Sequence, residues 1–282
     1  MENDIREKTE FSVAMCVYGK DNPKWFRRAL ESVYSQTIIP NEVVLVVDGP
    51  IGDDLQSVIE EYSSVDGFKA IYLETNQGHG NARRKSLESC SYELVALMDA
   101  DDVCLSDRFE KQLQAFSDNN EVSVVGGNIS EFIEQEENIV GYRIVPEKHD
   151  DIVKYMKKRC PMNQVSVMFK NTDVKETGGY VDWFCEEDYY LWLRMFLAGK
   201  KFYNLQDTLV NVRVGKDMYA RRGGWKYYKS EKALQKYMLK NKIIGYGTYL
   251  GNVLKRFIVQ VLMPNKLRGW VFKKFARQRK GK

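Results

Sequence analysis

Short apolar runs alternate with amphipathic segments through the first hundred residues. Runs typical of buried strands cover residues 11–18, 42–48, 68–73 and 94–98. Between them, apolar side chains spaced three and four apart predict helices over residues 25–36, 54–62 and 81–90. Strands that alternate with helices at this spacing predict a parallel sheet with right-handed crossovers.

The second half of the chain has a less regular pattern. We expect a strand and turn over residues 122–128, where Gly126 and Gly127 stand, and strands over residues 139–145 and 165–170. Residues 152–158 predict a helix, and another helix follows a run of acids at 186–188. A chain of 282 residues with 44% hydrophobic content fits one large α/β domain plus an appendage, which we place at residues 1–228 and 229–282.

The strongest chemical signal stands where the fourth predicted strand ends, at Asp99, Asp101 and Asp102. In open α/β sheets ligands bind outside the carboxyl ends of the strands, and carboxylate oxygens suit a hard cation such as Mg²⁺ or Mn²⁺. The pattern therefore predicts a metal ion with a phosphorylated ligand. The alternative is a solvated acidic turn before a helix that begins near Leu105, since Asp is common at strand ends and N-caps.

A glycine-bearing loop precedes the third predicted helix. Gly78 and Gly80 permit close backbone approach, and Arg83 and Arg84 stand in the first turn of that helix, whose N-terminus favours phosphate. The loop follows the third strand and has no third glycine, so it does not match the dinucleotide-binding fingerprint. Taken alone, it is a weak signal.

The second acidic stretch is Glu186, Glu187 and Asp188, at the start of a helix with Leu191 and Met195 on one face. These acids are candidates for acid–base chemistry. They also complement a helix dipole, which is the structural alternative.

Charge is divided unevenly along the chain. The formal net charge is +4, but residues 1–231 carry 29 basic and 39 acidic side chains, whereas residues 232–282 carry 14 basic side chains and no acidic one. This polarity predicts a basic surface for an anionic partner, either membrane headgroups or nucleic acid.

Cysteine spacing and the N-terminus favour a cytoplasmic location. The five cysteines contain no Cys-x-x-Cys pair, and residues 1–10 are charged and lack the apolar stretch of a signal peptide. No apolar stretch approaches the roughly 20 residues that span a bilayer, so we do not expect an integral membrane protein.

Taken together, these motifs resemble the family 2 glycosyltransferases with the GT-A fold, in particular the branch that builds bacterial surface polysaccharides such as O-antigen. The match runs from about residue 11 to about residue 224. The family's early strand with a Tyr near its end corresponds to residues 13–18, which end in Val17 and Tyr18, and its nucleobase-binding Asp corresponds to Asp48. Its Asn-x-Gly-x-Gly-x-Ala-Arg segment corresponds to residues 76–83, its metal-binding Asp-x-Asp to residues 99–101, and its Glu-Asp before Leu-Trp-Leu-Arg to residues 187–194.

The resemblance implies a nucleotide-binding half at residues 11–105 and an acceptor-binding half at residues 106–228. It assigns nucleotide-sugar binding to Val17, Tyr18, Asp48, Gly80, Arg83, Asp99, Ala100 and Asp101. Asp99 and Asp101 would hold Mn²⁺ or Mg²⁺ against the diphosphate, while Arg83 helps to offset charge on the leaving nucleotide.

The resemblance also implies inversion at the anomeric carbon, with Asp188 taking the proton of the attacking hydroxyl. Glu187 and Trp183 are then acceptor-binding candidates, although the spacing of Trp183 also suits a core position. A histidine that many relatives place after the last core strand is absent here. Arg221 and Arg222 follow instead and are candidate diphosphate contacts.

The substrates that the resemblance implies are a nucleotide sugar, UDP-Gal or UDP-Glc, and a saccharide linked to a polyprenyl diphosphate. Such an acceptor lies at the inner face of the cell membrane, where we expect a peripheral protein. No nucleic-acid partner is expected, because an acidic body would repel phosphate. The oligomeric state is not indicated.

The appendage fits this location. Leu250, Val253, Leu254, Phe257, Ile258, Val261 and Leu262 fall on one helical face, with Lys255, Arg256 and Gln260 on or near the other, and residues 267–277 repeat the pattern after Pro264. Basic amphipathic helices with Trp and Phe lie in the surface of an anionic bilayer, so residues 249–282 predict membrane docking. The alternative is packing of this apolar face on the catalytic domain or on a second subunit.

Two other classes of protein remain open on sequence alone. A sugar nucleotidyltransferase would use the same strand-end carboxylates, but usually has a glycine-rich loop directly after its first strand, where only Gly19 and Lys20 stand. A non-enzymatic protein that binds anionic polymers through the basic tail would leave both acidic motifs unexplained.

Overall fold

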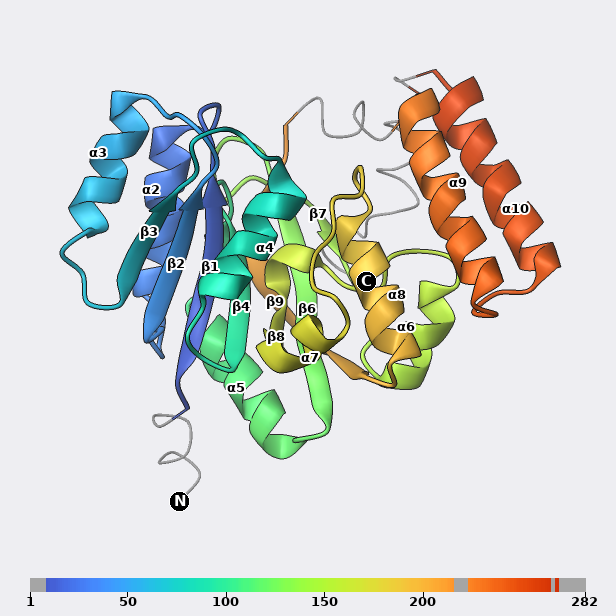
Figure 1. Cartoon of the computed structure of the whole chain (residues 1–282), viewed down its shortest axis with the longest axis horizontal. Helices are drawn as coiled ribbons and strands as arrows, with labels where there is room; N and C mark the ends of the chain where they lie inside the picture. The colour runs from blue at the N-terminus through green and yellow to red at the C-terminus, as the bar shows by residue number, and fades with distance from the viewer. Residues whose placement is uncertain (1–8, 216–222, 265–266, 269–282) are drawn as a thin grey trace.

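The computed structural model describes residues 9–215, 223–264 and 267–268. Four parallel strands form the first half of the sheet: β1 (Phe11–Val17), β2 (Glu42–Val47), β3 (Phe68–Tyr72) and β4 (Leu94–Asp99). The helices α2 (Pro23–Tyr34), α3 (Asp53–Tyr62) and α4 (His79–Ser89) connect them, as the periodicity predicts. Figure 1 shows α4 on one face of these strands and α2 with α3 on the other.

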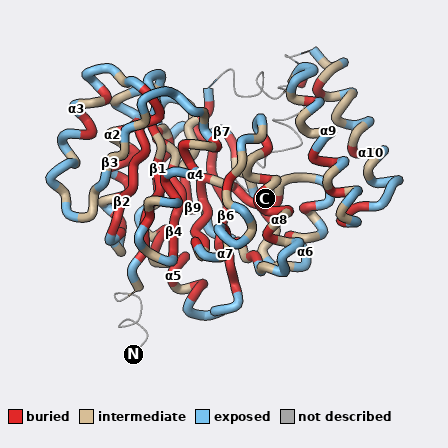
Figure 2. Tube along the Cα trace, in the orientation of Figure 1, coloured by how far each residue is buried: buried red, intermediate tan, exposed pale blue. Residues whose placement is uncertain are grey.

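Alternation along the strands produces a core on each face of the sheet. On β1, Phe11, Val13 and Met15 point into a cluster with α2, α3 and α5 (Arg108–Asp118), whereas Ala14 points into the cluster on the α4 side. Both clusters are buried, and Figure 2 shows the sheet as the most deeply buried part of the molecule.

The second half makes the sheet mixed rather than mostly parallel. Its elements are β5 (Val103–Cys104), β6 (Val122–Phe132), β7 (Ile139–Arg143), β8 (Met168–Lys170) and β9 (Lys201–Arg213), in the order β3-β2-β1-β4-β8-β6-β9-β5, with β7 beside β6. Among the described residues, four of the eight strand pairings are antiparallel, and all four involve these later strands. The chain doubles back after β6, so β8 enters the sheet against the direction of β4 and β6.

Two local predictions need correction. Gly126 and Gly127 do not form a turn, because β6 continues through them; a Cβ on Gly127 would lie 2.5 Å from Leu209 Cδ1, so the glycine permits close packing of β9. The expected strand at residues 165–170 is divided into a 3₁₀ turn, η1 (Gln164–Ser166), and the shorter β8.

The remaining helices cover the second half of the sheet and extend beyond it. These helices are α6 (His149–Met156), α7 (Asn171–Glu176), α8 (Glu187–Leu197), α9 (Trp225–Lys240) and α10 (Tyr246–Phe257), and α10 continues into a π-helical segment, Ile258–Leu262. Figure 1 shows α9 and α10 side by side, with α10 outermost. Residue 228, where we expect the catalytic domain to end, lies within α9. Within the described ranges, no helix combines the length and apolar character needed to cross a bilayer.

Candidate active site

The carboxyl ends of three neighbouring strands meet at one edge of the sheet. The register pairs Val17 of β1 with Val47 of β2, the residue before Asp48. It also pairs Cys16 of β1 with Asp99 of β4. The donor-side residues expected from the sequence therefore end adjacent strands.

Asp48 holds the glycine-bearing loop against the end of β2. Its Oδ1 accepts a hydrogen bond from the Gln77 N–H at 2.7 Å, and its Oδ2 accepts one from the Gly78 N–H at 3.1 Å. Gly49 has a φ of 87°, and a Cβ there would lie 2.6 Å from the backbone nitrogen of Asn76. Since each carboxylate oxygen has a further lone pair, Asp48 can still accept from a ligand.

Arg83 connects α4 to the end of β4. Its guanidinium is buried, donates from Nη2 to Asp99 Oδ1 at 2.5 Å and lies 5.9 Å from the ring centre of Tyr180. Burial disfavours the charge of Asp99, but Arg83 outweighs it and lowers the pKa of that carboxyl. In the same helix, a Cβ on Gly80 would lie 3.3 Å from Val181 O, so α4 also approaches the segment before α8.

Carboxylates gather around the end of β4. Asp21, in the turn after β1, accepts a hydrogen bond from the Tyr18 N–H at 2.9 Å. Burial, together with the charges of Asp99 and Asp21, raises the pKa of Asp101 to about 6. Burial likewise raises the pKa of Asp21 to about 6. Negative charge thus accumulates at a place where a cation would relieve it.

The third acid of the run has a different environment. Asp102 is buried and accepts a hydrogen bond from the Arg213 N–H at 2.8 Å, while Arg213 Nε donates to the backbone oxygen of Asp101 at 3.1 Å. Burial raises the pKa of Asp102 well above its ordinary value. Asp102 therefore connects β9 to the end of β4. Ala100, between Asp99 and Asp101, is also buried.

The donor set fits a divalent cation that is held partly by its substrate. In the part of the chain that the structure describes, no group of three or more His, Cys, Asp and Glu side chains is arranged to bind a metal. Asp99 and Asp101 supply hard carboxylate oxygens, and Mg²⁺ commonly takes one or two carboxylates together with phosphates and waters. A diphosphate would complete such a site.

Asp188, the base expected from the sequence, lies at the start of α8. Its Oδ1 accepts a hydrogen bond from the Tyr189 N–H at 2.6 Å, and the Cys160 thiol lies 3.7 Å from its Oδ2. Burial raises the pKa of Asp188 above its ordinary value, while the nearby positive charges of Arg143 and Arg83 oppose the rise.

The residues that precede Asp188 differ in burial and in their contacts. Glu186 is buried, and burial together with Glu231 of α9 raises its pKa well above the ordinary value. Glu187 is partly exposed, and burial with the charge of Asp188 raises its pKa to about 7. Trp183 packs on Tyr190 with ring centres 4.6 Å apart and donates from Nε1 to Ser230 Oγ at 2.9 Å, so it joins the segment before α8 to α9.

Three side chains at this site were not identified from the sequence. Asp21 lies in a turn and Gln164 in η1, and no local pattern marks either one. His79 precedes the helix expected at residues 81–90, but in the structure it begins α4, where Arg83 and then burial lower its pKa to about 4. The expected diphosphate contacts Arg221 and Arg222 lie outside the described residues.

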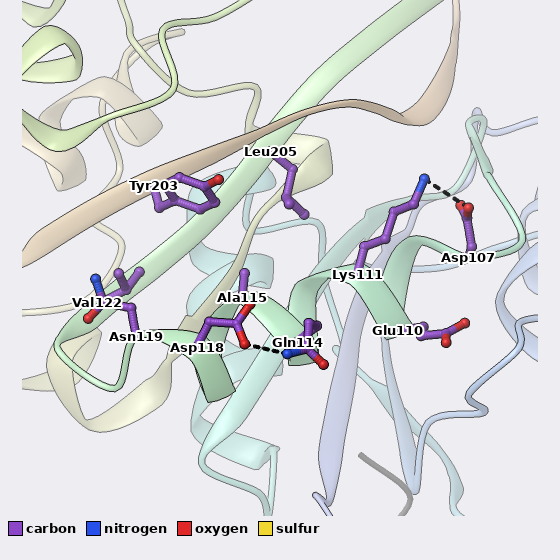
Figure 3. A pocket seen from close by; sticks show the side chains of 10 residues that line it. All are labelled: Asp107, Glu110, Lys111, Gln114, Ala115, Asp118, Asn119, Val122, Tyr203 and Leu205. Atoms are coloured by element: carbon purple, nitrogen blue, oxygen red, sulfur yellow. Dashed lines mark hydrogen bonds and ion pairs between the residues drawn. The ribbon is translucent and has the colours of Figure 1, made fainter. Parts of the chain in front are cut away.

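A separate surface pocket lies over α5 and β9 (Figure 3). It is lined by Asp107, Glu110, Lys111, Gln114, Ala115, Asp118, Asn119, Val122, Tyr203 and Leu205. This lining includes none of the candidate site residues described above.

The sheet, with an acidic strand end and an acidic start of α8 beside it, fits the glycosyltransferases of the GT-A fold. Residues 12–174 match the family described as glycosyl transferase family 2. The chain belongs to this family. The protein is therefore a glycosyltransferase, rather than a nucleotidyltransferase or a non-enzymatic binder.

Curated relatives cover nearly the whole chain. It is 35% identical to UDP-Gal:alpha-D-GlcNAc-diphosphoundecaprenol beta-1,3-galactosyltransferase of Escherichia coli, over 95% of this chain and 97% of that protein. It is also 35% identical to the amylovoran biosynthesis glycosyltransferase AmsE of Erwinia amylovora, over 94% and 98% of the two chains. These similarities confirm the branch expected from the sequence, that of bacterial polysaccharide assembly.

Solved structures confirm the fold. TarS residues 1–349 of S. aureus in complex with UDP-GlcNAc superposes with a TM-score of 0.65 at 18% identity, covering 89% of this chain and 73% of that one. The mannosyltransferase PcManGT of Pyrobaculum calidifontis, in complex with GDP-Man and Mn²⁺, gives a TM-score of 0.60 at 15% identity, covering 92% and 71%. At these identities the similarity shows the GT-A fold.

Proposed function

We propose that the protein is an inverting, metal-dependent glycosyltransferase that moves a hexose from a nucleotide sugar to a hydroxyl group of a lipid-linked saccharide. One observation carries the proposal: Arg83 lies between the acid expected to bind the donor and the acid expected to activate the acceptor. Its Nη2 donates a hydrogen bond to Asp99 at 2.5 Å, and one amide group, that of Gln164, lies 2.6 Å from its Nη1 and 3.2 Å from Asp188 Oδ2. Sugar transfer needs a stabilised leaving group and a base within one site, and this arrangement supports both.

On the donor side, the chain's own groups would bind and orient the nucleotide sugar. Val17, Tyr18 and Asp48 end β1 and β2 where the nucleoside would lie. Asp99 and Asp101 would hold Mn²⁺ or Mg²⁺, which supplies positive charge to the diphosphate. Arg83 adds a fixed positive charge beside the same group, and preorganised charge of this kind stabilises negative charge that develops on a leaving group.

On the acceptor side, Asp188 would act as the general base. The acceptor oxygen forms a bond to the anomeric carbon as the bond from that carbon to the diphosphate breaks, and the hydroxyl proton passes to the Asp188 carboxylate. Attack from the face opposite the leaving group inverts the configuration. A positioned general base contributes about 10² to 10⁴ in rate. Glu187, whose pKa is raised to about 7, would bind acceptor hydroxyls, and Trp183 would line the acceptor side.

For the substrates, we propose UDP-Gal or UDP-Glc as donor and a polyprenyl diphosphate-linked saccharide as acceptor. The relative from Escherichia coli, whose name states both classes of substrate, supports this assignment because it aligns over 95% of the chain. The test is a donor screen: the protein is incubated with Mn²⁺, a synthetic GlcNAc-diphosphate lipid and UDP-, GDP- or dTDP-sugars, and product is measured by chromatography. Turnover of dTDP-rhamnose or GDP-mannose alone would refute the assignment.

We further propose that the outer face of α10 docks on the anionic inner surface of the cell membrane. The inner face of α10 carries buried polar contacts. Asn252 Nδ2 donates to Lys157 O at 2.9 Å and to Gln235 Oε1 at 2.8 Å, and Arg256 forms a 2.9 Å ion pair with Glu231 of α9. These polar contacts and the packing of Phe257 on Trp225 and Tyr228 of α9 attach α10 to the body. Phe257, expected from the sequence on the free apolar face, therefore contacts α9 instead.

The opposite face of α10 is apolar and exposed. Every fourth residue of α10 and of the π-helical segment that continues it contributes to this face: Tyr246, Leu250, Leu254, Ile258 and Leu262. Figure 2 shows most of α10 as exposed or intermediate. Residues 232–282 carry basic side chains without an acidic one, so an anionic lipid surface complements both the apolar face and the charge. Each Lys or Arg near such a surface adds about 1 kcal/mol to binding.

A further inference from the structure

The side chain of Gln164 lies between the donor-side arginine and the proposed base. With its amide oxygen toward α4, Gln164 Oε1 accepts a hydrogen bond from Arg83 Nη1 at 2.6 Å. Its Nε2 then donates to Asp188 Oδ2 at 3.2 Å. Arg83 uses its other terminal nitrogen for Asp99, so a continuous line of hydrogen bonds runs from Asp99 through Arg83 and Gln164 to Asp188.

We propose that Gln164 is a positioning residue that fixes the Asp188 carboxylate for proton transfer while its own amide is held by Arg83. This inference rests on the proposed function, because it takes Asp188 as the base. The proposal does not require Gln164 to contact the substrate.

Two hydrogen bonds on different oxygens define the orientation of the Asp188 carboxylate. The Tyr189 N–H binds Oδ1 from within α8, and the Gln164 amide binds Oδ2 from η1. The Cys160 thiol at 3.7 Å from Oδ2 is a weak donor and restrains that oxygen little. Without Gln164, one oxygen would be held mainly by Cys160, and the carboxylate could rotate about its bond to Cβ. A misplacement of about 1 Å can cost roughly 10²-fold in rate.

An uncharged amide suits this place better than a direct ion pair. If Arg83 reached Asp188 itself, its charge would lower the pKa of the base and weaken its affinity for a proton. The amide presents an acceptor to the cation and a donor to the carboxylate, a combination that a glutamate at neutral pH lacks. Gln164 thereby couples the position of the base to that of Arg83 and leaves the carboxylate basic.

The backbone around Gln164 is held by other side chains. Asn163 Nδ2 donates to Gly127 O at 2.8 Å, Ser166 Oγ donates to the same oxygen at 3.1 Å, and Gln112 Nε2 donates to Ser166 O at 2.9 Å. The turn should therefore keep its shape when the side chain of residue 164 is replaced by one of similar length.

The experiment is a double-mutant cycle between Gln164→Met and Asp188→Asn. Methionine has nearly the same length and removes both hydrogen bonds. Initial rates are measured with UDP-galactose, Mn²⁺ and the GlcNAc-diphosphate lipid, and UDP affinity is measured by calorimetry. We expect Gln164→Met to lower kcat by about 10- to 100-fold, with KM for UDP-galactose and Kd for UDP within about threefold of wild type. In the Asp188→Asn background the same substitution should change kcat by less than about twofold, because its effect acts through the base.

Gln164→Glu and a surface control separate the two hydrogen bonds from general damage. Gln164→Glu keeps the acceptor for Arg83 and loses the donor for Asp188, so it should lower kcat as Gln164→Met does. Gln114→Met, on the exposed face of α5 beside Asp118, should leave kcat unchanged. An unchanged kcat in Gln164→Met, or an equal fall in both backgrounds, overturns the inference. An Asp188→Asn enzyme that transfers at the wild-type rate would instead overturn the proposed base.

Discussion

Binding of the apolar outer face of α10 to lipid can be tested without knowing which sugar the enzyme transfers. The side chain of Leu254 is 60% exposed. Full burial of a leucine side chain contributes about 1.5 to 3 kcal/mol, so insertion of the exposed part of Leu254 into lipid should contribute about 1 to 2 kcal/mol. Leu254→Gln should therefore weaken partitioning onto vesicles by about 5- to 30-fold.

The assay is sedimentation with vesicles of phosphatidylglycerol and phosphatidylcholine in equal amounts. A series of lipid concentrations gives the partition coefficient of each variant. Ile39→Gln is the matched control, because Ile39 is 58% exposed but lies in the connection between α2 and β2. It should change the coefficient by less than about twofold, since only residues that enter the lipid contribute their burial. Substitution is preferable to deletion of residues 249–282, which would also remove the polar contacts of Asn252 and Arg256 with the body.

Two results would refute this reasoning. If Leu254→Gln and wild type sediment equally with the vesicles, the outer face of α10 does not enter lipid. If wild type is a dimer by analytical ultracentrifugation and Leu254→Gln is a monomer, the same face is a subunit interface instead.

The remaining predictions concern the site and the core. Asp188→Asn should lower transfer by about 10² to 10⁴ while metal-dependent UDP binding by calorimetry stays near wild type, and substantial residual transfer would assign the base elsewhere. The kcat of the wild type should fall on acidification at a higher pH than an exposed Asp with a pKa of about 3.9 would give, because burial raises the pKa of Asp188 and only its ionised form accepts a proton; a pH–rate profile checks this. Asp101→Ala should weaken both UDP binding and transfer, and equal UDP affinity with and without Mn²⁺ in wild type would contradict that role. Gly127→Ala should destabilise the fold by about 1 to 3 kcal/mol in thermal unfolding, because its Cβ would meet Leu209, whereas Gly215→Ala, with open space around it, should not.

Much of residues 11–105, the expected nucleotide-binding half, could be predicted from sequence. Each strand, helix and strand-end acid there is marked by a pattern within a few neighbouring residues. A buried strand appears in the sequence as an apolar run. An acid at its end, such as Asp48 or Asp99, must lie at the carboxyl edge of the sheet. Parallel strands with helical crossovers bring those edges together whatever the loops contain. The sequence therefore predicted the α/β class and the neighbourhood of Asp48, Asp99 and Arg83.

The rest depends on contacts between distant segments, which periodicity does not encode. Gln164 joins Arg83 and Asp188 only because β8 runs antiparallel between β4 and β6, and this placed η1 beside α4 and α8. The charge of Asp21, in the turn after β1, acts on Asp101, which follows β4 some eighty residues later. On α10, a helical pattern shows two faces but does not say which one packs, and buried partners on α9 decided that the polar face is the inner one.

The hydrogen bond between Trp183 and Ser230 has a consequence for which acceptors can react. It fastens the segment before Asp188 to α9, and α9 is fastened in turn to α10. With the outer face of α10 resting on lipid, the base would stand at a fixed height above the headgroups. A saccharide on a diphosphate anchor rises from the same surface by one ring for each sugar it contains. The enzyme would therefore select acceptors by the height of the terminal sugar above the headgroups. A lipid lengthened by one internal sugar would then carry its terminal hydroxyl past Asp188, even where that terminal sugar is the correct one.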